Sequence, residues 1–176
     1  EPITIYNAVI GKQHPYLMGN YFETLKGYLA TDPEFKNRFN ALYREAKRKL
    51  PISKAAALSS VKEFATYAED EIIEYAFLYR MTGEKAFAEG AVDLMLKTMN
   101  MRNWNTGNTI ETASLSQVCA IGFDWTYDYL TAEQIRTIAD TVWTKSLQYA
   151  YNLSKTGKNL GGMLNWSATC NHNWNF

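Results

Sequence analysis

The sequence predicts an all-α fold built from antiparallel helical hairpins. Apolar residues recur every three or four positions along most of the chain, and no segment shows a convincing strand-like alternation of apolar and polar residues. Residues that favour helix ends stand between these periodic segments. The 176 residues, 47% of them hydrophobic, fit one domain with its own core. We therefore expect a single helical domain over residues 1–176.

Two helices are expected near the start of the chain. The first, over residues 21–29, follows a potential capping box formed by Asn20 and Glu23. The second, over residues 33–49, follows Asp32 and begins with a proline, which is favoured at the first helical position because it lacks the amide hydrogen that would stay unpaired there.

The clearest helical pattern covers residues 61–82. Ser60 and Glu63 match a capping box at its start, and Gly83 is a permissive stop at its end. The next helix is expected over residues 84–99, so the link is very short and the two helices should lie antiparallel. One face of the first helix is formed by Val61, Phe64, Ala68, Ile72, Tyr75 and Tyr79.

Two further helices are expected, over residues 109–129 and 132–154. Potential capping boxes precede them, Asn108 with Glu111 and Thr131 with Gln134. The helices differ in length and in aromatic content, and no repeat near the roughly 34 residues of a tetratricopeptide unit is found. This favours an irregular helical array or part of an (α/α) toroid over a regular solenoid.

Charge and motifs exclude several classes of function. The 18 basic residues are balanced by 18 acidic ones, whereas a general nucleic-acid binder needs clustered Lys and Arg. No apolar run approaches the roughly 18 to 20 residues of a membrane-spanning helix, so we expect no membrane partner. No zinc-binding, P-loop or nucleophile-elbow motif occurs, so neither a metal nor a cofactor is expected. Cys119 and Cys170 are expected to be buried free thiols.

The most informative motif is the segment Asn171, His172, Asn173, Trp174 and Asn175. Amide and imidazole groups hydrogen-bond to carboxylates and hydroxyls, and an indole face suits the apolar face of a sugar ring. This combination is typical of a carbohydrate site. The alternative is that the asparagines only supply turns and that the tryptophan anchors the loop to the core.

Four residues elsewhere are weaker candidates for carbohydrate chemistry. Trp104 lies in a polar loop, where it would either offer a platform to a sugar or fold over a helix end. Glu111, Asp124 and Asp128 are potential acid or base groups of a hydrolase. Glu111 could instead serve as a cap, and Asp128 could simply be exposed near a helix end.

Three segments of the chain, in order, carry a likeness to a known family. They are an opening segment, residues 14–18 (HPYLM), followed by residues 31–33 (TDP); a junction segment, residues 123–134 (FDWTYDYLTAEQ); and residues 171–175 (NHNWN). Together they resemble the N-terminal opening, the recurrent helix junction and the Asn/His active-site segment of heparinase II/III-type polysaccharide lyases.

The resemblance implies an N-terminal (α/α) toroid followed by a β-sandwich, with acidic polysaccharide bound between them and cleaved by β-elimination at uronic acid residues. Asn171 and His172 match, by type, the donor that neutralises the substrate carboxylate and the catalytic base. Asn173 and Asn175 are substitutes if the alignment shifts. Trp174 and Trp104 are expected to bind substrate.

The resemblance also places a catalytic tyrosine, further helices and the β-sandwich beyond Phe176. We therefore expect the chain to be the N-terminal part of a longer lyase, with the missing helices and β-sandwich as its partners in the same protein. A periplasmic or secreted location is implied. The alternatives are an (α/α) toroid glycoside hydrolase that uses Asp or Glu and a non-catalytic helical module that binds carbohydrate or acts as a scaffold.

Overall fold

The computed structural model describes residues 13–105 and 109–155, and within these residues it confirms the all-α prediction, with no strand. No helix among them is both long enough and apolar enough to cross a bilayer. The helices are α2 (Tyr21–Thr31), α3 (Pro33–Ala55), α4 (Val61–Tyr67), α5 (Glu69–Thr82), α6 (Lys85–Asn100), α7 (Thr109–Thr126), the 3-10 turn η1 (Tyr127–Tyr129), α8 (Ala132–Val142), the π-helical segment η2 (Trp143–Leu147) and α9 (Gln148–Lys155).

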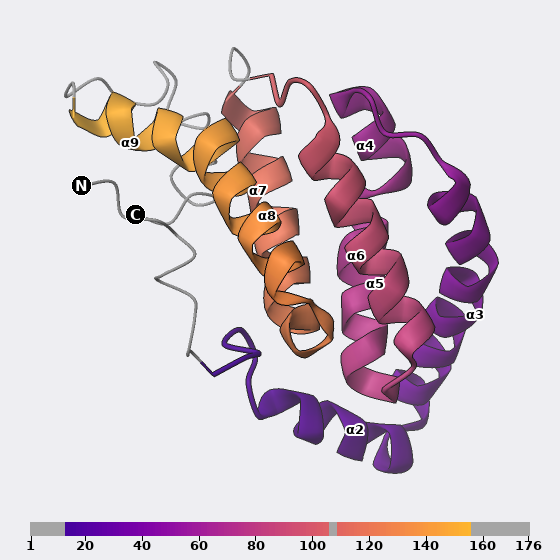
Figure 1. The fold of residues 1–176 in the computed structure, drawn as a ribbon. Helices are drawn as coiled ribbons and strands as arrows, with labels where there is room; N and C mark the ends of the chain where they lie inside the picture. The colour runs from indigo at the N-terminus through magenta and orange to yellow at the C-terminus, as the bar shows by residue number, and fades with distance from the viewer. Residues whose placement is uncertain (1–12, 106–108, 156–176) are drawn as a thin grey trace.

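Helices α5, α6, α7 and α8 lie side by side, while α3 runs along the outer flank and α2 crosses one end (Figure 1). The short links after α5 and after η1 fold α6 back along α5 and α8 back along α7, as expected for hairpins. The core fills the space between the central helices. Its fully buried side chains include Ile72, Tyr75 and Leu78 of α5, Leu94 and Met95 of α6, and Leu115 of α7.

Gly122 allows α7 to approach α5 and α6 closely. A Cβ atom at this position would lie 2.5 Å from Cγ2 of Ile72 and 2.9 Å from Sδ of Met95. Contacts this short do not occur between real side chains, so any larger residue would push the helices apart. The glycine thereby brings the last turn of α7, which carries Asp124, against the core.

Several expected helix ends are confirmed. Ser60 with Glu63 and Thr131 with Gln134 both form complete capping boxes. Gly83 adopts the left-handed conformation at the end of α5, with φ 72°. These ends were predictable because each depends on interactions within one turn of the helix.

Other helix boundaries differ from the prediction. The side chain of Asn20 makes no capping hydrogen bond, so the capping box expected there is wrong. Asp32 does cap α3 by accepting from the amides of Glu34 and Phe35. Helix α3 continues past residue 49, through Pro51, to residue 55.

Two of the predicted helices are interrupted. The helix expected over residues 61–82 breaks at Ala68, whose φ of −136° and ψ of −32° are not helical and separate α4 from α5. The helix expected over residues 132–154 contains the π-helical segment η2 between α8 and α9. Ala68 is fully buried, so tertiary packing rather than local propensity sets this break.

Candidate functional site

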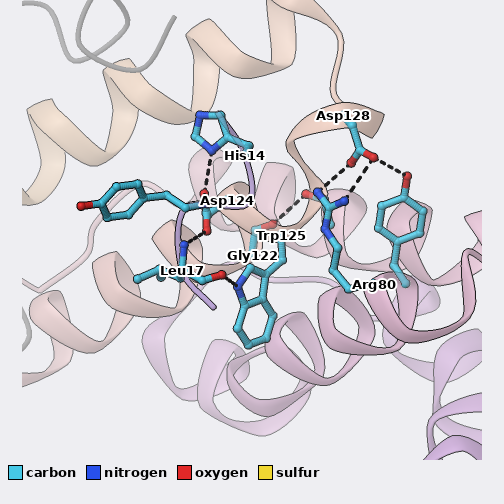
Figure 2. Close-up of polar contacts among 10 residues, drawn as sticks. His14, Leu17, Arg80, Gly122, Asp124, Trp125 and Asp128 are labelled. Carbon is cyan, nitrogen blue, oxygen red and sulfur yellow. Dashed lines mark hydrogen bonds and ion pairs between the residues drawn. The ribbon is translucent and has the colours of Figure 1, made fainter. Parts of the chain in front are cut away.

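The opening segment crosses the last turn of α7 and binds to it. Positive φ angles at Met18 (64°) and Gly19 (40°) turn the chain into α2, and the His14–Pro15 peptide bond is cis. The indole Nε1 of Trp125 donates to the carbonyl oxygen of Leu17 at 3.2 Å. Figure 2 shows this contact beside a carboxylate that also joins the opening segment to the junction segment at the end of α7.

That carboxylate belongs to Asp124, whose side chain is only 9% exposed. Its Oδ1 accepts from Nδ1 of His14 at 2.6 Å and from the amide of Tyr16 at 2.8 Å. Its Oδ2 accepts from the amide of Leu17 at 2.8 Å. Three donors offset the cost of burying a carboxylate, and hydrogen bonds to an ionised group are roughly twice as strong as neutral ones. Asp124 therefore holds the opening segment on α7.

The imidazole of His14 is enclosed in the same place, with its side chain 8% exposed. It stacks on the ring of Tyr127, with centroids 3.8 Å apart, and meets the edge of Phe123. An ionised carboxylate can only accept, so Nδ1 of His14 carries the proton in this pair. In the neutral ring, Nε2 then presents a lone pair.

Nε2 of His14 is buried and has no hydrogen-bond partner among the residues that the structure describes. It points away from Asp124 (Figure 2). Most buried polar atoms in proteins are satisfied, so an unpaired imidazole nitrogen marks either a functional role or a position for a water or ligand. This makes His14 the most informative polar side chain among the described residues.

A cavity of about 540 Å³ lies beside His14 and Asp124. Its apolar walls include Phe123 of α7 and side chains of α8 and η2, among them Ile138, Val142 and Leu147. The thiol of Cys119 also lines it. Burial raises the pKa of this free thiol, so Cys119 is suited to packing and not to nucleophilic chemistry.

The other two carboxylates considered as acid or base groups have structural partners. Asp128 forms a two-pronged ion pair with Arg80, at 2.9 and 3.2 Å, and accepts from the hydroxyl of Tyr79 at 3.3 Å (Figure 2). Burial and the nearby carboxylate raise the pKa of Tyr79. Glu111 accepts from the side-chain amide of Asn105 at 2.6 Å. Among the three, Asp124 is the one that lines the cavity.

Trp104 does not offer the platform expected of it. The residue is 1% exposed, and its Nε1 donates to the carbonyl oxygen of Thr98 at 3.1 Å. Lys145 donates to the carbonyl oxygens of Met99 and Met101 in the same turn. The indole is therefore folded over the C-terminal end of α6, and no face is left for a sugar ring. The structure agrees with the alternative prediction, in which Trp104 folds over a helix end.

The remaining predicted site residues, Asn171, His172, Asn173, Trp174 and Asn175, lie outside the described residues. The sequence does not predict the pairing of His14 with Asp124, although each residue lies in one of the segments that resemble the lyase family. A separation of 110 positions leaves no periodic pattern that could have linked them.

Within residues 13–105 and 109–155, no group of three or more His, Cys, Asp or Glu side chains could hold a metal ion. No protein-family model matches the chain, and no curated protein matches it. The contacts of the described residues and the resemblance of the three segments therefore carry the functional proposal.

Proposed function

We propose that the chain is the N-terminal helical portion of a polysaccharide lyase that cleaves uronic-acid-containing polysaccharide by β-elimination. One observation carries the proposal. The opening segment and the junction segment, which separately resemble parts of the heparinase II/III-type lyases, bind one another through Asp124. Two segments that form one structural unit are expected to occur together in a sequence, so this contact supports the combined resemblance.

The helical hairpins support the same proposal. An (α/α) toroid is a closed ring of such hairpins, and α5 with α6 and α7 with α8 have the required antiparallel arrangement. In this proposal the described helices form part of the ring. The remaining helices, a catalytic tyrosine and the β-sandwich come from the same protein, which acts in the periplasm or is secreted.

The chemistry assigns roles by residue type. A base removes the proton next to the uronate carboxylate, the released electron pair forms a carbon–carbon double bond, and the glycosidic oxygen leaves with a proton from an acid. His172 is the proposed base, and Asn171 the proposed donor to the carboxylate as its negative charge grows. Asn173 or Asn175 takes the donor role if the alignment is shifted, and Trp174 is proposed to contact the sugar ring.

The test uses the full encoded chain with a panel of uronate polysaccharides, namely alginate, hyaluronan and heparan sulfate. Two quantities are followed together: the ultraviolet absorbance of the new conjugated double bond and the number of new reducing ends. A lyase produces both in equal amounts. A hydrolase produces reducing ends alone, and a binding module produces neither, so either result would overturn the proposal.

A variant of the proposed base makes the test specific. His172→Ala should lower turnover by at least about 100-fold, the usual contribution of a general base. Ser167→Ala is the matched control, since it removes a polar group from the same stretch of sequence without touching the proposed site. Equal activity of the two variants would contradict the role given to His172.

A further inference from the structure

We propose that the cavity beside His14 binds a small, mainly apolar molecule that carries one hydroxyl group, and that Nε2 of His14 accepts the hydrogen of that hydroxyl. This inference is independent of the polysaccharide proposal above. It is argued from residues within 13–105 and 109–155, and it requires no turnover of polysaccharide.

The walls of the cavity determine the body of the ligand. They are apolar, with Leu17, Phe123, Ile138, Val142 and Leu147 among the side chains that line them. A volume of about 540 Å³ lies within the range of small-molecule sites, roughly 300–1,000 Å³. A sugar ring would leave most of its hydroxyls unpaired against such walls, which is unfavourable. A single aromatic or branched aliphatic group fits them better.

His14 supplies the polar contact and acts as the acceptor of the hydrogen bond, so the ligand must donate. Its side chain is more than nine-tenths buried and lines the cavity, and Nε2 has no partner within residues 13–105 and 109–155. Asp124 accepts from Nδ1, which places the proton there and leaves the lone pair on Nε2. Through this lone pair, Nε2 accepts from a hydrogen-bond donor such as an alcohol or a phenol.

Asp124 is already engaged by the opening segment. Both of its oxygen atoms already accept hydrogen bonds, two at Oδ1 and one at Oδ2. Its role is to fix the orientation and the tautomer of His14, in the way that a carboxylate orients the histidine of a catalytic triad. Among the described residues, His14 therefore supplies the polar anchor, set in a mainly apolar wall.

The π-helical segment η2 is a second, independent feature of the same cavity. Leu147, at its end, and Val142, just before it, both line the cavity. Single-turn π-helical segments within α-helices occur frequently at functional sites, because the wider turn changes the direction of the side chains around it. Here the segment stands between α8 and α9, and its last residue, Leu147, lines the cavity together with His14.

Binding of p-cresol and toluene to the full chain tests the proposal. The two probes share a ring and a methyl group and differ in the hydroxyl, so the ratio of their dissociation constants isolates the hydrogen bond. We expect the preference for p-cresol to be about tenfold greater in the wild type than in His14→Phe, as one buried hydrogen bond contributes about a factor of ten. Phenylalanine keeps a ring beside Tyr127 but has no acceptor.

A ratio that is unchanged by His14→Phe would overturn the proposal, as would failure of p-cresol to bind the wild type. A second measurement needs no variant at position 14, in case that variant fails to fold. The chain has two histidines, so ¹⁵N-labelled histidine gives two sets of imidazole resonances, and His172→Gln assigns them. We expect p-cresol to shift the Nε2 resonance of His14 and toluene to leave it in place; equal responses to both probes would contradict the proposal.

Discussion

Replacement of Asp124 by Asn tests how the opening segment is held on α7. The carboxylate accepts from Nδ1 of His14 and from the amides of Tyr16 and Leu17. An asparagine of the same shape keeps one oxygen, but its amide group places a donor against at least one of these donors. The change therefore loses one hydrogen bond and removes the charge from the others.

The size of the effect follows from these contacts. A hydrogen bond to a charged group contributes about 1.5–3 kcal/mol, and an unpaired buried donor costs about 1–3 kcal/mol. Because the two effects overlap, we expect Asp124→Asn to lower the free energy of unfolding by about 2–4 kcal/mol. For a domain of this size that is a fall in the melting temperature of about 5–15 °C.

Thermal and urea unfolding, followed by circular dichroism, measure this loss. Asp140→Asn is the matched control, because Asp140 is exposed on α8, and its change should stay within about 0.5 kcal/mol. If the two variants are equally stable, the carboxylate does not hold the opening segment and the reasoning is refuted.

Three further predictions concern stability. Gly122→Ala should destabilise the protein by about 1–3 kcal/mol through overpacking. Gly27→Ala should instead stabilise it by about 0.4–1 kcal/mol, because an added Cβ atom there has no neighbouring atom within 4 Å. Urea unfolding of both variants checks the pair, and equal effects would contradict the prediction. Burial raises the pKa of Glu74, so ionisation of this carboxyl opposes folding. Glu74→Gln should therefore have the higher free energy of unfolding at pH 7. This gain in stability should vanish as the pH falls below about 4.3, the pKa of a glutamate in the unfolded chain. A gain that persists in acid would count against this cause. Trp104→Phe should lower the free energy of unfolding by about 1–3 kcal/mol, because side-chain volume and the hydrogen bond to Thr98 are lost. The same variant should leave polysaccharide affinity unchanged in a binding assay. Weaker binding by a folded variant would show that Trp104 contacts the polysaccharide after all.

Features that depend on neighbouring residues were predictable from the sequence. The capping boxes at Ser60 and Thr131 and the stop at Gly83 are each complete within a few residues, so their chemistry is visible in the sequence. The break at Ala68 and the continuation through Pro51 were missed. Ala68 is fully buried, so its break depends on how the helix packs against others, and a local pattern carries no information about that packing.

The candidate site also combines features visible in the sequence with contacts that form only in the folded chain. His14 and Asp124 each stood in a segment that resembled a known family, but their contact joins positions 110 apart and could be found only in the folded chain. Trp104 was assigned to substrate because its loop is polar. In the structure Trp104 is buried and donates to Thr98 at the end of α6, and Lys145 of η2 donates to the carbonyl oxygens of Met99 and Met101 in the same turn.

The mass of the products formed by the full encoded chain from a uronate polysaccharide tests the central proposal most directly. β-Elimination cleaves the glycosidic bond without adding water, so each new non-reducing end should carry an unsaturated uronate that is lighter by one water than a hydrolysis product. The account predicts these unsaturated oligosaccharides and their loss in His172→Ala. Saturated products of full mass, from an active protein, would contradict it.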